Sequence, residues 1–362
     1  MAKKILTCVG TRPNFIKTVN LRELLEQRGF EYKLLHTGQH FDHNMSGIFF
    51  KELNLGEPDF HLNVKGSSNN EVVGKIILAM EPVIESYRPD LIMVPGDVNS
   101  TFACAFAASA CRVPVAHIES GLRSFDRSMP EEINRILVDD LSDLLFVTEE
   151  SGVQNLHREG KSAEKIKFVG NTMIDALVRF LPFIEQSDIR TRYNLSDYYL
   201  VTFHRPSNVD TENALEEIIR LLEEVSRTKQ VVFPVHPRTR KRLAEHKVAS
   251  LLDKPNIILT DPVGYLDFIH LLKYAAAVLT DSGGIQEEST YLGIPCLTIR
   301  PNTERPVTIT VGTNTLVPFD RKRILSLLDD IAQGRYKTGR VPPLWDGKAS
   351  ERIAEEVRRF FA

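Results

Sequence analysis

Short apolar runs alternate with longer segments in which apolar residues recur at helical spacing, from one end of the chain to the other. The runs are almost free of polar residues, which is typical of parallel strands covered on both faces, and the segments between them predict amphipathic helices. The predicted strands are 5–9, 32–36, 91–95, 113–118, 144–147 and 166–169, then 199–203, 231–235, 257–259, 277–280 and 296–299. The clearest predicted helices are 15–27, 71–87, 214–226 and 265–274. This alternation predicts an α/β fold built from two doubly wound, Rossmann-like sheets.

The two series of strands are separated by a polar stretch around 186–197 that carries no strand signal. A chain of 362 residues is also longer than one ordinary core requires. We therefore predict an N-terminal domain over residues 1–172 and a second domain that begins at 173. Doubly wound sheets bind ligands beyond the carboxyl ends of their strands, so two such domains facing each other would form a cleft.

Composition narrows the class of protein. Apolar residues make up 42% of the chain and charged residues 26%, as in soluble globular proteins, and the net charge of −3 argues against a general nucleic-acid binder. The four cysteines are scattered without the spacing of a disulfide framework or a zinc site. The N-terminus carries too short an apolar run for a signal peptide, and no run is long enough to span a membrane. We expect a cytoplasmic protein without a bound metal.

The turn after the strand 277–280 is the strongest candidate for ligand binding. Ser282, Gly283 and Gly284 stand where a helix begins, so backbone N–H groups and the positive end of the helix dipole would face an anion. Glu287 and Glu288, about one turn later, could accept hydrogen bonds from sugar hydroxyls. No Lys-Ser/Thr pair follows, so the turn is not a Walker A loop. Taken alone, it is more often an ordinary turn with a serine cap.

Cations and histidines follow other predicted strands. Arg12 and Lys17 come after the first strand, where a phosphate contact competes with the simpler possibility of surface charge. His204 and His236 follow two strands of the second series, and Arg305 follows the last one. One isolated histidine is usually structural. Two at equivalent strand ends, next to a glycine turn, indicate a site that binds or protonates a phosphate.

Three carboxylates are candidates for acid–base chemistry in the first domain. Asp97 and Glu119 follow predicted strands, and Glu131 opens a predicted helix. Asp97 could simply cap a helix, and Glu131 could simply complement a helix dipole. Glutamate is a poor cap, so Glu119 favours function, and Arg123 could hold it ionised. If the three lie on one rim of a cleft, repulsion or burial could raise the pKa of a carboxyl group enough for it to act as a general acid or base.

In order and spacing, these segments resemble the non-hydrolysing UDP-N-acetylglucosamine 2-epimerase family. The resemblance rests on 10–13, 96–97, 117–119, 130–132, 204–205, 281–288 and 303–306, which together span nearly the whole chain. It implies a GT-B-like fold with a second domain over 173–345 that binds UDP, and a C-terminal helix over 346–362 that packs back on the first domain. It also implies a homodimer that interconverts UDP-GlcNAc and UDP-ManNAc, for surface polysaccharide precursors, without a cofactor.

The resemblance also implies a role for individual residues. The reacting groups would be Asp97, Glu119, Glu131 and His204. The UDP-sugar would be bound by Arg12, Lys17, His236, Phe268 beside the uracil, Ser282, Gly283, Gly284, Glu288 at the ribose, and Arg305. In the implied reaction, UDP leaves C1 while C2 loses its proton, and the resulting glycal takes UDP back after reprotonation on its other face.

Other functions remain open at this point. A hydrolysing epimerase or a GT-B glycosyltransferase would release UDP during turnover, and an epimerase of a modified UDP-sugar would require a different substrate. A nucleotide-sugar binding module without catalysis would have no reaction to lose when the three carboxylates are replaced.

Overall fold

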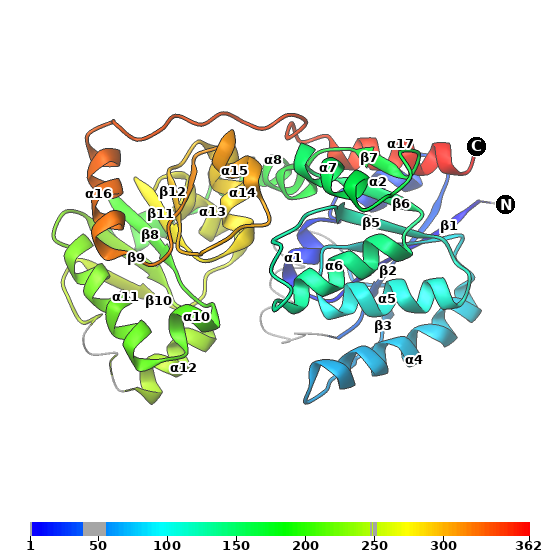
Figure 1. Ribbon diagram of the computed structural model, residues 1–362, viewed down its shortest axis with the longest axis horizontal. Coiled ribbons are helices and arrows are strands. Elements are labelled where there is room, and N and C mark those ends of the chain that lie inside the picture. The colour runs from blue at the N-terminus through cyan, green and yellow to red at the C-terminus, as the bar shows by residue number, and fades with distance from the viewer. Residues whose placement is uncertain (1, 39–55, 247, 249–251) are drawn as a thin grey trace. The chain divides into compact units, whose positions relative to one another are not determined.

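The computed structural model describes residues 2–38, 56–246, 248 and 252–362, and the chain divides into two compact units (Figure 1). The first unit comprises Met1–Arg179 and Pro343–Ala362, and the second comprises Phe180–Pro342. The sequence predicted the first boundary after residue 172, but helix α8 (Thr172–Ile184) is continuous through that point. Its Asp175 accepts hydrogen bonds from the backbone of Ala349 (3.0 Å) and Ser350 (2.5 Å), which ties the start of α8 to the first unit.

The first unit contains a seven-stranded parallel sheet with the order β3-β2-β1-β4-β5-β6-β7. Its strands are β1 (Lys4–Val9), β2 (Glu31–His36), β3 (Phe60–His61), β4 (Leu91–Pro95), β5 (Val115–Ser120), β6 (Leu144–Val147) and β7 (Ile166–Phe168). Its helices, besides α8, are α1 (Arg12–Ile16), α2 (Leu21–Glu26), α4 (Asn69–Tyr87), α5 (Asn99–Ala110), α6 (Pro130–Leu141), α7 (Glu150–Arg158) and α17 (Ala349–Phe360).

The second unit contains a six-stranded parallel sheet with the order β10-β9-β8-β11-β12-β13. Its strands are β8 (Tyr198–Thr202), β9 (Gln230–Pro234), β10 (Ile257–Thr260), β11 (Ala277–Thr280), β12 (Cys296–Thr298) and β13 (Asn314–Leu316). Its helices are α9 (Ile189–Arg192), α10 (Pro206–Val209), α11 (Glu212–Val225), α12 (Pro237–Glu245), α13 (Tyr265–Lys273), α14 (Gly283–Leu292), α15 (Pro306–Thr310) and α16 (Arg321–Ala332).

Each sheet reverses its strand order at one point. In the first unit the reversal lies between β1 and β4, and in the second it lies between β8 and β11. Connections leave to opposite sides at such a point, which opens a crevice at the carboxyl ends of the two strands. The Arg12 and Asp97 segments follow β1 and β4, and the His204 and Ser282 segments follow β8 and β11. These four predicted segments therefore follow the strands that border the two reversals, whereas Glu119 lies in β5 and His236 follows β9.

The predicted strands are all present, with ends that match or shift by at most two residues, but the structure also contains strands that the sequence did not predict. Both β3 and β13 are short edge strands without an apolar run. The predicted helix over 15–27 is wrong, because the chain forms two short helices, α1 and α2, with a turn between them. That turn contains Thr18, Val19 and Asn20, which are weak helix formers.

The C-terminal helix α17 packs against α2 in the first unit (Figure 1). The ring of Phe361 lies 5.9 Å from that of Phe30, and Glu356 forms an ion pair with Lys167 at 3.2 Å. Just before α17, the buried indole of Trp345 donates to the carbonyl of Thr148 at 2.9 Å. The last segment of the chain thus completes the first unit.

Candidate active site

The turn after β4 needs a glycine at position 96. Gly96 has a φ of +70°, in the left-handed region. A Cβ at this position would lie 3.0 Å from Lys17 Nζ and 3.1 Å from Asn14 Nδ2. The Asn14 amide donates to the carbonyl of Pro95 at 2.8 Å, so α1 is fastened to the end of β4. This close packing fixes the turn that carries Asp97.

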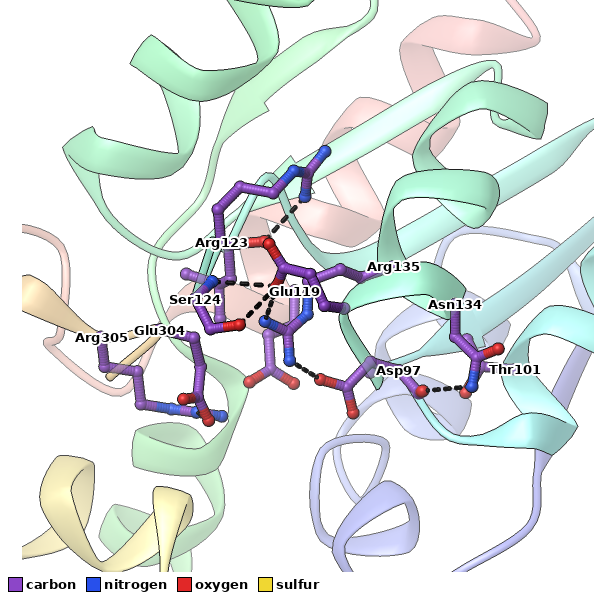
Figure 2. A network of polar contacts seen from close by, with 12 residues as sticks. Asp97, Thr101, Glu119, Arg123, Ser124, Asn134, Arg135, Glu304 and Arg305 are labelled. Carbon is purple, nitrogen blue, oxygen red and sulfur yellow. Dashed lines mark hydrogen bonds and ion pairs between the residues drawn. The ribbon is translucent and has the colours of Figure 1, made fainter. Parts of the chain in front are cut away.

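Asp97 is held by a buried arginine from α6. Arg135 donates a hydrogen bond from one guanidinium nitrogen to Asp97 Oδ2 at 2.5 Å (Figure 2). From another it donates to Glu132 Oε2 at 2.7 Å. Glu132 also accepts from the backbone and hydroxyl of Ser124 and from the backbone of Phe125, each at 2.9 Å. The Asp97 side chain retains 29% exposure, whereas that of Arg135 retains 3%. The network therefore orients a carboxylate that a ligand can still reach.

Glu119 is held by the lysine that caps the C-terminus of α1. Its side chain is buried and forms an ion pair with Lys17, which is also buried. Glu119 has a φ of +75°, and the β5–β6 register shifts between Ile118 and Ser120. A non-glycine residue in this conformation costs about 1–3 kcal/mol, and such strain is concentrated at functional sites. The sequence predicted Arg123 as the partner of Glu119. This prediction is wrong, because Arg123 forms ion pairs with other acidic residues.

Beneath these groups, a buried ion network joins three elements. His117 Nδ1 lies 2.6 Å from Asp139, and its Nε2 lies 2.8 Å from the carbonyl of Gly96. Asp139 also binds Arg123 at 2.7 Å and accepts from the backbone of Gly121 at 3.1 Å. Burial alone would raise the pKa of Asp139, but the charges and hydrogen bonds of His117 and Arg123 hold it below its ordinary value. The network fixes the ends of β4 and β5 relative to α6.

Two further predicted site residues of the first unit, Glu131 and Arg12, lie at the starts of helices. Glu131 is exposed in the first turn of α6, next to the buried Glu132. Arg12 is the first residue of α1, and its side chain lies outside the described part of the structure. The structure therefore brings Lys17 and Glu119 together beside the Gly96 turn that carries Asp97.

In the second unit, the two glycines of the Ser282 turn differ in their surroundings. Ser282 is the N-cap of α14, yet its hydroxyl accepts no cap hydrogen bond from the described helix backbone. A Cβ on Gly283 would lie 2.9 Å from Arg305 Nη1 and 3.0 Å from Glu304 Oε1, so this glycine makes room for the Arg305 side chain. A Cβ on Gly284 would meet no described atom within 4 Å. The start of α14 therefore has open space on one side, as an anion site requires.

Arg305 lies against this turn because two carboxylates hold it there. Its Nε is 2.9 Å from Glu287, and its Nη1 donates to Glu304 at 2.5 Å; Figure 2 shows Glu304 and Arg305. Arg300 donates to the same Glu304 at 3.0 Å. Of the two glutamates considered for sugar hydroxyls, Glu287 is thus engaged by an arginine. Glu288, which is buried in the same helix, is the one that the family resemblance named.

The two histidines of this unit lie close together. The ring centroids of His204 and His236 are 5.3 Å apart, at the ends of β8 and β9. His204 Nδ1 lies 3.0 Å from the buried carboxylate of Asp281. Phe268 lies in α13, which connects β10 to β11, and is partly exposed. Two imidazoles and a helix N-terminus thus follow the adjacent strands β9, β8 and β11, an arrangement suited to binding a phosphate.

Sequence similarity to known proteins identifies the family of this chain. A family model described as UDP-N-acetylglucosamine 2-epimerase matches residues 22–358. The chain belongs to the UDP-N-acetylglucosamine 2-epimerase family. It is 41% identical over 358 residues to the UDP-N-acetylglucosamine 2-epimerase of Methanocaldococcus jannaschii, and the match covers 97% of each chain. It is also 41% identical over 362 residues to the UDP-2,3-diacetamido-2,3-dideoxy-D-glucuronate 2-epimerase of Pseudomonas aeruginosa, covering 98% of this chain and 99% of that one.

A solved structure within the epimerase family supports the same assignment. It is the crystal structure of the Methanocaldococcus jannaschii UDP-GlcNAc 2-epimerase in complex with UDP-GlcNAc and UDP. The structural match has a TM-score of 0.90 at 40% identity and covers 98% of this chain and 99% of the other. The predictions of this family, of an epimerase and of a GT-B-like α/β fold with two parallel sheets are therefore confirmed.

The described residues offer neither a cluster of metal ligands nor a membrane-spanning helix. Residues 2–38, 56–246, 248 and 252–362 contain no group of three or more His, Cys, Asp or Glu side chains arranged to hold a metal ion. In the same residues, every helix is too short or too polar to cross a membrane.

The sequence did not predict three buried charged residues that bind candidate site residues or their neighbours. These are Arg135, Asp139 and Asp281, which bind Asp97, His117 and His204 respectively. Arg135 left a weak signal, because it follows Glu132 at the i,i+3 spacing of a helical ion pair. Asp139 and Asp281 left none, because their partners lie 22 and 77 residues away in sequence.

Proposed function

We propose that this epimerase interconverts UDP-N-acetylglucosamine and UDP-N-acetylmannosamine by eliminating and re-adding UDP. UDP binds at the strand ends of the second unit, and the carboxylates of the first unit carry out the proton transfers. One observation carries the proposal. The two sheets reverse their strand order at the segments that supply the opposite chemistries: Asp97 follows β4 in one unit, and His204 and Ser282 follow β8 and β11 in the other.

The chemistry explains why both kinds of group are needed. The C2–H bond of the sugar lies next to no carbonyl, so direct removal of this proton gives no stabilised carbanion. In the elimination, a carboxylate takes the C2 proton, the electron pair of that bond forms the C1=C2 double bond, and the C1–O bond breaks with its pair leaving on UDP. Reprotonation of C2 on the other face and return of UDP to C1 complete the inversion.

The second unit stabilises the diphosphate as it departs. Each well-placed donor to such a developing charge contributes roughly 3 kcal/mol to the transition state. The candidate donors are the N–H groups at the start of α14, the imidazoles of His204 and His236, and Arg305. Glu288 binds the ribose and Phe268 lies beside the uracil. Arg12 and Lys17 complete the set of groups for the leaving UDP.

The first unit supplies the acid and the base. Asp97 is partly exposed and oriented by Arg135, while Glu119 is buried on Lys17 in a strained conformation. Glu131 is exposed one turn from Arg135. Three carboxylates provide a base for one face of C2 and a proton donor for the other, with one more to orient the sugar.

A second candidate is an epimerase of a modified UDP-sugar. It rests on the relative from Pseudomonas aeruginosa, whose substrate carries two acetamido groups and a carboxylate, and which is as similar to this chain as the archaeal enzyme. Both substrates share the UDP group and the C2 acetamido group, so the same residues would serve either one.

A time course in heavy water tests the proposal. Incubation with UDP-N-acetylglucosamine should place solvent deuterium at C2 and produce UDP-N-acetylmannosamine, both followed by NMR. An unlabelled, unchanged substrate would overturn it. Free UDP that accumulates with the sugar would instead identify a hydrolysing epimerase, and label that enters only the 2,3-diacetamido glucuronate substrate would identify the second candidate.

We further propose that the protein is a cytoplasmic homodimer that supplies precursors of surface polysaccharides. Exposed apolar side chains on the neighbouring helices α4 and α5 support the dimer, because Leu78 is 73% exposed and Phe106 is 43% exposed. Light scattering should give twice the chain mass for the wild type. A dimer that persists unchanged in a Leu78→Glu, Phe106→Glu double variant would place the interface elsewhere.

A further inference from the structure

Asp281 connects the ends of β8 and β11 through a single buried carboxylate. Its side chain is fully buried. It accepts hydrogen bonds from the backbone of His204 (3.0 Å) and Arg205 (2.9 Å) and from the side-chain amide of Asn208 (3.0 Å). Its own backbone carbonyl accepts from Arg205 Nε at 3.0 Å. The segment that carries His204 is therefore built around this one residue.

The same carboxylate also contacts the imidazole of His204, with Oδ1 at 3.0 Å from Nδ1. Burial alone would raise the pKa of Asp281, but His204 and the donors of Asn208 and Arg205 outweigh it and hold the pKa below its ordinary value. Asp281 is thus an ionised acceptor, and Nδ1 must carry the proton of this contact. Nε2 is then the ring nitrogen that remains for a ligand.

Asp281 is also the residue just before the N-cap of α14. Its backbone N–H donates to the carbonyl of Thr202 at 3.3 Å, so β8 and β11 stay paired up to the start of the Ser282–Gly284 turn. The side chain that orients the His204 ring therefore belongs to the turn that presents the helix N-terminus. A shift of one of these groups would shift the other.

We propose that Asp281 is a positioning residue that fixes the Nδ1–H tautomer of His204 and directs its Nε2 toward the diphosphate seated at Ser282–Gly284. The inference rests on the proposed function, because it assigns His204 the departing UDP. In its charged form the ring carries a proton on both nitrogens, and Nε2–H donates to the leaving oxygen as the C1–O bond breaks. Asp281 stabilises that charge and accepts no proton itself.

A simpler role for Asp281 is structural, as a tie between two strand ends. A tie of this kind would change the stability of the second unit and the binding of UDP. It would not select a tautomer, and it would not separate the effect on kcat from that on KM. These two measurements therefore distinguish the roles.

The experiment compares the wild type with Asp281→Asn, which keeps the size of the side chain and removes its charge. Histidines are labelled with ¹⁵N, and the His204 signal is identified by its absence in His204→Gln. At a pH at which the ring is neutral, the wild type should show the Nδ1–H form, and Asp281→Asn should show a mixture or the Nε2–H form. The kcat for UDP-N-acetylglucosamine should fall about 10²-fold while KM changes only a few-fold, as expected for a disabled acid–base group.

Asp210→Asn is the matched control, because Asp210 ends the same segment and binds Arg238 and Arg242 instead of His204. It should retain the wild-type tautomer and kcat. The double variant His204→Gln, Asp281→Asn should be no slower than His204→Gln alone, because Asp281 acts through the histidine. Calorimetric titration with UDP shows whether each variant keeps its binding site.

The proposal is overturned if Asp281→Asn retains the wild-type kcat or tautomer, or if the double variant is much slower than His204→Gln. If Asp281→Asn does not fold, the wild-type spectrum alone decides, and an Nε2–H tautomer overturns the proposal. If the wild type neither labels C2 nor forms the epimer, the proposed function fails. In that case the tautomer spectra and the UDP titrations still test whether Asp281 fixes the tautomer of His204.

Discussion

The two units use the same device with opposite charge. In the first, a reachable carboxylate is held by a buried cation: the side chain of Asp97 is 29% exposed and that of Arg135 is 3% exposed. In the second, a reachable imidazole is held by a buried carboxylate: the side chain of His204 is 37% exposed and that of Asp281 is 0% exposed. The buried partner sets the geometry, and the exposed partner is available for chemistry. The proposed reaction, which removes a proton from carbon and releases a diphosphate, would use both arrangements.

The sharpest test of this comparison removes the chemistry of the first unit. Glu119→Gln and Asp97→Asn should each reduce epimerisation by about 10³-fold, within the range that general acid–base groups contribute, because an amide neither takes nor gives the C2 proton. The rate is measured from deuterium incorporation and from UDP-N-acetylmannosamine formation.

Asp140→Asn provides the control, since Asp140 is an exposed residue of α6 that pairs with Lys161. It should retain the wild-type rate. A Glu119→Gln enzyme with more than a tenth of the wild-type rate would contradict the assignment of the first unit.

The next test removes the buried partner of the first unit. Arg135→Met removes the cation that pairs with both Asp97 and the buried Glu132. Because a buried carboxylate then loses its ion pair, the unfolding free energy should fall by about 3–5 kcal/mol. Activity should fall roughly 10²-fold, because Asp97 is no longer oriented. Urea denaturation and the rate assay measure the two effects.

Arg158→Met is a suitable control, because Arg158 is exposed in the last turn of α7. It should change stability by less than about 0.5 kcal/mol. If Arg135→Met were as stable and active as this control, the buried cation would not set the geometry of Asp97.

The glycines of the second unit provide a test of intermediate size. Gly284→Ala adds a methyl group where the start of α14 faces open space, so UDP should bind about tenfold more weakly while helix stability rises by ~0.5 kcal/mol. Gly283→Ala should weaken UDP binding and also destabilise the protein, because its methyl group meets Arg305 and Glu304. Calorimetric titration and thermal unfolding separate the two. Equal effects of both substitutions on stability would contradict the difference between these positions.

The smallest expected effect is on the pH dependence of stability. The pKa of Asp281 lies below its ordinary value in the folded protein, so this residue contributes stability above the unfolded pKa of about 4 and loses it as pH falls through the folded pKa. Asp281→Asn lacks this contribution. The difference in unfolding free energy between the wild type and this variant should therefore narrow below about pH 5. A difference that stays constant as the pH falls would contradict the depressed pKa.

The local sequence determined most of the secondary structure. Apolar runs such as 91–95, 144–147 and 277–280 match their strands to the residue, because burial on both faces demands an uninterrupted apolar segment. The local sequence did not predict the edge strands β3 and β13, because they contain no apolar run. It also did not predict the turn between α1 and α2, because the helical pattern continues through that turn.

By itself, the sequence placed the candidate site residues at the ends of strands: a carboxylate at 97, a histidine at 204 and a glycine turn at 282–284. Only the tertiary structure decided which charges meet, because ion pairs such as Lys17–Glu119 and His204–Asp281 join residues 102 and 77 positions apart. A local pattern records whether a side chain is buried and which helix or strand it occupies. The partner of a charged group depends on strand order and register, which bring β4 beside β1 and β11 beside β8.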